Sequence, residues 1–188
     1  MAWTIDAAHT TIGFVARHMG LSKVRGQFSS FTGEIEGDPD DLTSARGRVE
    51  VDMASVDTGN ADRDAHLKSA DFFDVENHPM MVFETKKISN AGHDFKVIGD
   101  LTIKGITKEV EFDYEHGGYE VDPFGNSKLG GALTGTINRR DWGLSWNVAL
   151  DTGGVLVSEK IKIEIDFQLV QSKAASEANG KSDERLAV

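Results

Sequence analysis

The residues best suited to chemistry are crowded into one short stretch, RDAHLKSADFFD, at residues 63–74. Asp62 and His66 are four residues apart, so a helix would place both side chains on one side. Asp64 and His66 could act as an acid and a base with Arg63 beside them, which is the enzymatic interpretation of the stretch. No G-x-S-x-G nucleophile motif and no phosphate-binding glycine loop accompanies them in the chain.

A metal site is the second chemical interpretation of this stretch. Such a site would need a third or fourth ligand, and Asp74 and His78 are available. The spacing matches no zinc signature, and the chain contains no cysteine, which also excludes disulfides and iron–sulfur clusters. We therefore expect no catalytic residue, no bound metal and no cofactor.

The same stretch also has a structural interpretation as a short helical cap at about 60–75. Asn60 is a good N-cap, and Asp62 falls in the first turn, where the helix dipole favours an acid. The helix could run to about Ser69, with a second turn over the two adjacent phenylalanines. In this interpretation the charges serve as caps and local ion pairs, and the phenyl rings cover what the neighbouring strands enclose.

Most of the remaining chain alternates apolar with polar residues, as strands do. The longest example is EKIKIEIDFQLV, where one face carries Ile161, Ile163, Ile165, Phe167 and Leu169. We count about eight strands with short connections, so the chain is expected to be all-β and antiparallel. Closure into a barrel would remove the exposed sheet edges, but a two-sheet sandwich would give the same pattern.

Several expected strands carry small residues on the presumed inner face, at Ala16, Gly99, Gly131 and Gly135. Glycine inside a strand marks a bend or a close approach, and it leaves space where a side chain would otherwise lie. An eight-stranded barrel is wide enough either to fill with side chains or to hold a small ligand. The alternative is that large neighbours such as Phe14 and Phe83 fill these gaps, and the pattern alone does not decide between the two.

The length of 188 residues and the net charge of −11 set outer limits on function. We expect one domain over residues 1–170, followed by a disordered tail at 171–188, which is small, polar and aperiodic. The negative charge disfavours nucleic-acid binding and adsorption to anionic membranes. No apolar run is long enough to cross a membrane, and the N-terminus resembles no signal peptide, so we expect no stable membrane insertion and a cytoplasmic location.

Three stretches in order along the chain, RDAHLKSADFFD, GDLTIKGITKEVEFD and INRRDWGL, carry a resemblance to a known family. From about Trp3 to Leu169 the sequence resembles the YceI-like family, also called polyisoprenoid-binding proteins. The resemblance implies a lipocalin-like antiparallel barrel with an elongated pore that holds a long isoprenoid, such as a polyprenyl quinone precursor. It implies no catalytic activity and a homodimer. Many members carry a secretion signal and work in the periplasm, whereas this chain shows none.

The expected function is therefore non-enzymatic binding, with transport or storage of a long isoprenoid or another apolar small molecule. The residues expected to line the pore are Phe14, Phe28, Phe31, Met53, Leu67, Phe72, Phe73, Phe83, Leu133, Ile163 and Phe167. The alternatives are an enzyme that uses Asp64, His66 and Arg63 on an apolar substrate, and a solid-cored barrel that serves as a ligand-free interaction module.

The head group of such a lipid is expected to meet His18, Arg63 or His66. Each has a structural alternative, because Arg63 could pair with a neighbouring aspartate and His18 could serve only the turn backbone. Arg139 and Arg140 could meet a phosphate or pyrophosphate head, with a solvated basic turn as the alternative.

Overall fold

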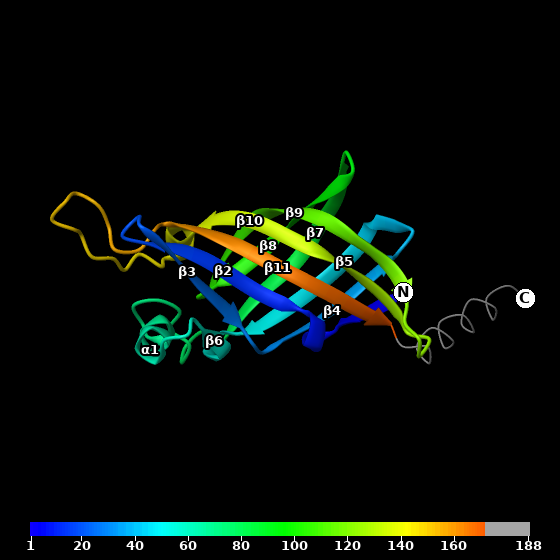
Figure 1. Cartoon of the computed structure of the whole chain (residues 1–188), viewed down its shortest axis with the longest axis horizontal. Coiled ribbons are helices and arrows are strands. Elements are labelled where there is room, and N and C mark those ends of the chain that lie inside the picture. Colours follow the sequence, from blue (N-terminus) through cyan, green and yellow to red (C-terminus); the bar gives the residue numbers. More distant parts are fainter. Residues whose placement is uncertain (172–188) are drawn as a thin grey trace, which may run out of the picture.

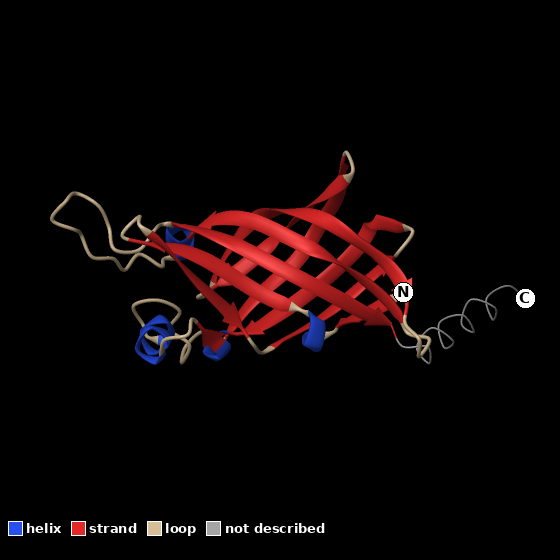
Figure 2. Cartoon of the chain, in the orientation of Figure 1, coloured by secondary structure: helices blue, strands red, loops and turns tan. Residues whose placement is uncertain are grey.

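The computed structural model describes residues 1–171, so the predicted tail lies outside the described residues except for Gln171. The strands are β1 (Ala2–Ile5), β2 (Thr11–His18), β3 (Ser22–Phe28), β4 (Phe31–Asp38), β5 (Asp41–Asp52), β6 (Val56–Asp57), β7 (Met80–Ala91), β8 (Asp94–Ile103), β9 (Ile106–Val121), β10 (Ser127–Asn138) and β11 (Lys160–Gln171). The helical elements are α1 (Ala61–Lys68) and the 3-10 helices η1 (Ala7–His9), η2 (Met53–Ser55) and η3 (Arg139–Trp142). In the view of Figure 2, α1, η1 and η2 lie along one edge of the strands, and η3 lies at one end of them. None of the helices within residues 1–171 has the length and apolar character needed to span a membrane.

Eight strands form a closed antiparallel ring in the order β1, β4, β5, β7, β8, β9, β10, β11. The ring closes because β11 pairs back to β1, with Thr4 opposite Val170. The strands run obliquely around the long axis of the molecule (Figure 1). The prediction of an antiparallel barrel of about eight strands with a short helical cap is therefore confirmed, and the sandwich alternative is not what the chain forms.

The two ends of the barrel are built differently because β11 has two partners along the same edge. Near its C-terminal end it pairs with β1, and over Lys162–Asp166 it pairs with β2. Beyond β2 the sheet continues through β3 to the short strand β6, where Phe28 lies opposite Val56. The end of the barrel near α1 is therefore bordered by β2, β3 and β6, and the other end by β1 and β4.

The residues that alternate between apolar and polar in the sequence form neighbouring strands of the barrel wall. The alternating apolar residues of β11 lie opposite inward positions of β10, such as Leu133 opposite Ile165. β3 ends at Phe28 and β4 begins at Phe31, so only two residues separate these strands. The two serines between them are held by η2, since the Ser30 amide donates to Ser55 Oγ at 3.1 Å.

The apolar core consists of one large cluster of buried side chains and a smaller second cluster near β1. Met53 and Trp142 are among its most buried side chains, at 2% exposure each. The Trp142 indole Nε1 donates to the carbonyl of Leu101 at 3.0 Å, so its one polar atom is satisfied. The second cluster contains Trp3, and together the two clusters run from the α1 end to the β1 end.

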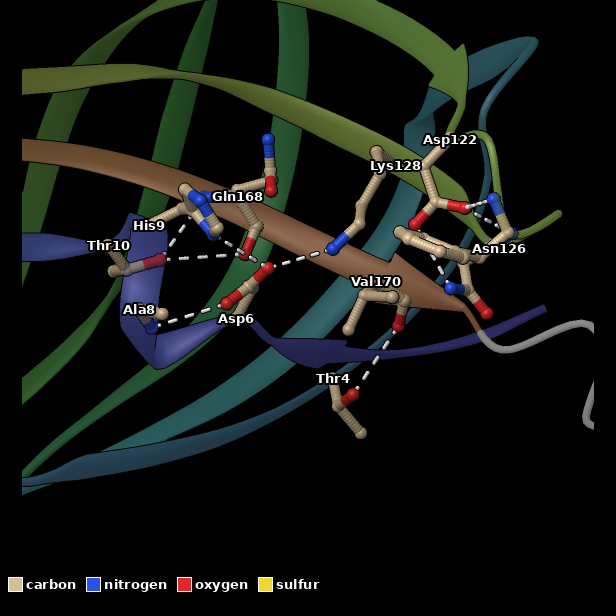
Figure 3. A network of polar contacts seen from close by, with 11 residues as sticks. Thr4, Asp6, Ala8, His9, Thr10, Asp122, Asn126, Lys128, Gln168 and Val170 are labelled. Carbon is tan, nitrogen blue, oxygen red and sulfur yellow. Dashed lines mark hydrogen bonds and ion pairs between the residues drawn. The ribbon is translucent and has the colours of Figure 1, made fainter.

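A polar network replaces strand pairing where the chain passes from β1 to β2 (Figure 3). The Asp6 carboxylate accepts from Lys128 Nζ at 2.8 Å and from the Ala8 amide at 3.2 Å, and it contacts His9 Nδ1 at 3.0 Å. The backbone of Gln168 is satisfied here by the Asp6 amide and by the Thr10 hydroxyl. The network thus keeps the backbone groups of β11 paired across the break between its two partners.

The hydrogen bond from Lys128, with a smaller contribution from His9, lowers the pKa of Asp6, although burial opposes the shift. Because the folded pKa lies below the unfolded one, ionised Asp6 stabilises the fold above about pH 4, and this stabilisation is lost as the pH falls through the folded pKa. We expect Asp6→Asn to lower the free energy of unfolding near neutral pH by about 1 kcal/mol, with the difference from wild type shrinking in acid.

Urea unfolding of both proteins across a pH series would measure this difference. Lys128→Met and the double variant complete a double-mutant cycle. A difference that stays constant down to the acid limit, or a cycle without coupling between the two positions, would contradict the role given to the pair.

Candidate binding cavity

The barrel encloses a cavity of about 300 Å³ whose wall receives side chains from all eight strands of the ring. On β11 the lining residues are Ile161, Ile163, Ile165, Phe167 and Leu169. Eight residue steps separate the first from the last, which corresponds to about 26 Å along the strand. The lining residues run from one end of the barrel to the other, so the free volume is drawn out along the barrel, and we refer to it as the tube.

Ten of the eleven residues expected to line a pore lie on the wall of this cavity. They are Phe14, Phe28, Met53, Leu67, Phe72, Phe73, Phe83, Leu133, Ile163 and Phe167. Phe31 lies elsewhere, because it begins β4 at the seam beside β1 and borders a separate outer depression together with Ile5 and Glu50. Its side chain still packs against the core from that position.

The inward glycines of the wall are covered by aromatic rings from neighbouring positions. A Cβ atom built on Gly26 would lie 2.3 Å from Cζ of Phe14, and one on Gly99 would lie 2.4 Å from Cζ of Phe83. The rings therefore fill the gaps that these glycines leave, as the second interpretation of the pattern held. Both rings are also among the residues that line the remaining free volume.

The same arrangement recurs on β10. A Cβ on Gly131 would meet Cε2 of Tyr114 at 2.5 Å, and a Cβ on Gly135 would meet Cδ1 of Phe112 at 2.6 Å. Burial raises the pKa of Tyr114 to about 12, so this wall phenol stays protonated, and its hydroxyl contacts His116 Nδ1 at 2.9 Å. The glycines thus allow bulky aromatic residues in a wall that still encloses free volume.

One end of the cavity is covered by the segment that contains α1, which lies beside β6 (Figure 1). The helix begins where Asn60 Oδ1 accepts from the amide of Arg63 at 2.9 Å, as the sequence predicts. After α1 ends at Lys68, tight turns bring Phe72 and Phe73 to the cavity together with Leu67. The rings of Phe73 and Phe28 are 6.1 Å apart, which ties the cap to the end of β3.

The three residues expected to meet a head group do not line the cavity. Arg63 donates from Nε to Thr58 Oγ1 and from Nη2 to the Thr58 carbonyl, both at 2.7 Å. It forms no ion pair with the neighbouring Asp64 or Asp71. His66 Nε2 lies 2.9 Å from Asp71 Oδ2, and its ring packs edge-on against Trp146 at 4.5 Å. Such local contacts within the cap occupy both side chains.

His18 is exposed at the end of β2, where the chain turns toward β3. Its carbonyl accepts from the amide of Leu21 at 2.9 Å, and its backbone forms an isolated bridge with Val157. The backbone of His18 therefore serves the turn, as the structural alternative held.

The geometry does not assemble the acid–base site that the spacing of Asp64 and His66 allowed. Asp64 Oδ1 accepts from the amide and the hydroxyl of Thr58, at 2.9 and 2.5 Å, whereas His66 contacts Asp71. Neither side chain lines the cavity in which an apolar substrate would lie. Among residues 1–171, no group of three histidine, aspartate or glutamate side chains is placed to hold a metal ion.

Arg139 is the only buried charged residue in the described part of the chain, at 4% exposure, and it lies on the cavity wall. Its guanidinium donates to the carbonyls of Leu144, Val157 and Ser158, and stands 5.9 Å from the centre of the Phe72 ring. Burial lowers its pKa. The sequence suggested either a phosphate contact or a solvated turn, but the side chain joins both ends of the loop at 143–159.

The other polar parts of the wall are few. Asp38 and Arg46 line it at the β4–β5 end, and Thr10 and Thr85 line it between the ends. Two nitrogen-to-oxygen contacts of 2.6 and 3.1 Å join Arg46 Nη1 to the carbonyls of Ala45 and Thr43. The rest of the wall is almost entirely hydrocarbon, so the cavity offers contact area to a ligand and few hydrogen bonds.

The amino-acid sequence of the chain is similar to those of known proteins. Residues 3–169 match the YceI-like domain family. A UPF0312 protein of Staphylococcus aureus (strain N315) is 41% identical over 163 residues, which cover 86% of this chain and 93% of the relative. The corresponding protein of S. aureus strain Mu50 shows the same identity and coverage.

Solved structures share the fold. The YCEI protein of Campylobacter jejuni is 30% identical, with a TM-score of 0.73 over 84% of this chain and 90% of that one. BcnA of Burkholderia cenocepacia gives a TM-score of 0.71 at 24% identity, over 89% and 99% of the two chains. A polyisoprenoid binding domain from Saccharophagus degradans gives 0.63 at 13% identity, over 89% and 97%. The last two, at these identities, show likeness of fold alone.

The packing of Phe14 on Gly26 can be tested by adding one methyl group. Gly26→Ala would place its Cβ inside the van der Waals radius of the ring, so Phe14 must leave the wall and enter the tube. We expect the free energy of unfolding to fall by about 1–3 kcal/mol, as for other overpacked sites. Chemical denaturation measures this change.

Two variants serve as controls for this packing test. Phe14→Leu combined with Gly26→Ala should remove most of the penalty, because the obstructing ring is gone. Gly154→Ala, whose Cβ would make an ordinary contact of 3.6 Å with Leu150, should be close to neutral. An equal loss of stability with and without the Phe14 ring would refute the packing argument.

Proposed function

The chain belongs to the YceI-like family, and from this premise we propose that it binds a long, mainly apolar lipid inside the barrel and carries or stores it without chemical change. The observation that carries this proposal is the narrow tube, whose wall is hydrocarbon along the whole of β11. The tube also counts against a solid-cored interaction module, and the cap residues proposed for catalysis lie outside it.

The energetics of such a site need few polar contacts. Burial of apolar surface contributes about 25 cal/mol per Å², so each 100 Å² of lipid removed from water contributes about 2.5 kcal/mol before the entropic costs of binding. A wall of aliphatic and aromatic side chains provides this along the full length of a chain-like ligand. Selection would then follow from the width and length of the tube.

The ligand class that we propose is an isoprenoid, such as a polyprenyl quinone precursor or a similar amphiphile. A narrow tube favours a linear chain over a broad fused-ring molecule. The likeness in fold to a protein described as a polyisoprenoid binding domain agrees with this choice. A small polar head would find its few partners at the ends of the wall, near Asp38 and Arg46 or near Arg139.

The test is lipid extraction from protein purified without detergent, followed by mass spectrometry and by uptake of an added polyprenol. We expect an extracted isoprenoid or saturable uptake of the polyprenol, with weaker uptake of a straight-chain fatty alcohol. A clean extract together with no uptake of either lipid would overturn the proposal. Preferred uptake of the fatty alcohol would overturn the isoprenoid assignment and leave lipid binding standing.

A substitution that fills the tube should abolish uptake. Leu133 lies on the wall, and its replacement in Leu133→Trp would place an indole in the tube. Because added bulk has little room there, we expect polyprenol uptake to fall roughly tenfold or more. Thr136→Trp adds an indole at an exposed position of the same strand and should bind normally. Equal uptake by the two variants, with matching melting temperatures, would place the lipid outside the barrel.

A further inference from the structure

The barrel wall has a seam where β5 and β7 no longer pair. The two strands lie opposite each other over five residue pairs, the last of which is Arg48 with Glu84. Within residues 1–171, the part of β5 at 41–47 finds a strand partner only in β4, and the part of β7 at 85–91 only in β8. The β7–β8 hairpin projects from the side of the barrel, away from the β4–β5 hairpin (Figure 1). We refer to the stretch between residues 41–47 and 85–91 as the seam.

The two edges of the seam carry features that prevent them from pairing. On β5, Arg46 Nη1 donates to the carbonyls of Ala45 and Thr43 at 2.6 and 3.1 Å, so a side chain serves these backbone groups in place of a strand. On β7 the register shifts at a bulge, where Lys86 and Lys87 follow each other. Lysines and bulges at an open strand edge discourage the addition of another strand. The seam is therefore protected from closing on itself and from pairing with a second chain.

The cavity reaches both edges of the seam from the inside. Ala45 and Gly47 on β5 line it, and so do Thr85 and Ile88 on β7. Leu42, near the start of β5, lines it as well. The rim of the seam is thus made of small or apolar side chains, so a hydrocarbon chain that crosses it stays in apolar contact.

The exposure of the lining residues indicates where the cavity meets solvent. Among the residues that line it, Asp38 and Arg46 alone are exposed, and all others are buried or half-buried. Both belong to the β4–β5 hairpin, and Arg46 lies on the β5 edge of the seam. The cavity therefore approaches the surface beside the seam.

Both ends of the barrel are closed by buried side chains. At the β1 end, Trp3 is 3% exposed, and its indole Nε1 donates to the carbonyl of Gly37 at 3.3 Å. At the α1 end, Phe72 and Arg139 are 6% and 4% exposed, and both line the cavity. Entry through either end would have to displace one of these side chains.

A second interruption of the wall, between β9 and β10, is covered. These strands stop pairing after Asp113 and Thr134. A Cβ atom built on Gly135 would still lie 3.1 Å from the carbonyl oxygen of Glu111, and η3 contacts β9 with Trp142 only 2% exposed. The chain thus fills one interruption of its wall with a buried indole and leaves the seam uncovered.

We propose that the seam is the portal through which the lipid enters and leaves the tube. The inference rests on the proposed lipid binding and adds its route. Passage between Ala45 and Ile88 breaks no strand pairing, whereas entry at an end displaces the buried ring of Trp3 or Phe72. The barrel can therefore exchange its cargo without unfolding any part of its ring.

The experiment joins the two edges of the seam with a covalent link. Because the chain has no cysteine, an engineered pair reacts selectively with a bismaleimide. Ala45→Cys with Ile88→Cys spans the seam. Ala70→Cys with Lys104→Cys is the matched control, since Lys104 Nζ donates to the Ala70 carbonyl at 3.0 Å, and the link there fixes the α1 segment to the β8–β9 turn. Each pair treated with N-ethylmaleimide provides the unlinked reference.

The measurement is the rate of polyprenol association and dissociation, together with Kd. We expect the link across the seam to slow both rates about tenfold or more, and to leave Kd within about twofold, because a portal changes the path and not the bound state. The link at the α1 segment should change either rate by less than about twofold.

Each outcome decides the inference. Unchanged rates after linkage of the seam, slower rates after linkage of the α1 segment, or a weaker Kd with unchanged association would overturn the portal while polyprenol binding stands. Links that form between two chains at the seam, seen as dimers on a denaturing gel, would assign the seam to contact between copies and would also overturn it. No binding of polyprenol by the unlinked proteins would refute the proposed cargo and the portal with it.

Discussion

The free volume of an eight-stranded barrel depends on where its largest side chains point, because such a barrel is just wide enough to fill itself. Here the rings of Phe14 and Phe83 lie over Gly26 and Gly99, at distances that leave no room for a Cβ atom. Each ring lies against the wall in the space that a missing side chain leaves at the glycine. Aromatic bulk and free interior volume are therefore compatible in this chain, and the proposed lipid site depends on these pairings.

Much of the fold could be predicted from the sequence because its signals are local. Alternation in β11 placed Ile161 to Leu169 on one face, and they form one side of the tube. Asn60 marked the start of α1 through its side-chain cap. The alternation of apolar and polar residues also identified most of the cavity wall, because successive side chains of a strand point to opposite faces of the sheet.

The polar parts of the site were harder to predict because distant segments decide them. In sequence Arg139 belongs to a basic turn, but its partners Val157 and Ser158 lie almost twenty residues away and bury it. His66 and Arg63 resemble ligand contacts until the fold shows that Asp71 and Thr58 occupy them. The sequence pattern singled out these side chains as candidate ligand contacts, but it could not show which protein groups they bind in the fold.

Pairing between the first strand and the last gives the barrel a particular order of assembly. Thr4 lies opposite Val170, so ring closure joins residues 166 positions apart, among the most distant in the described chain. On the ribosome the earlier strands emerge before their final partner, and such remote contacts form slowly because a long loop must close first. A nascent chain therefore has no enclosed tube until β11 has been synthesised, and a lipid must either enter a finished barrel or be wrapped as the last strand joins.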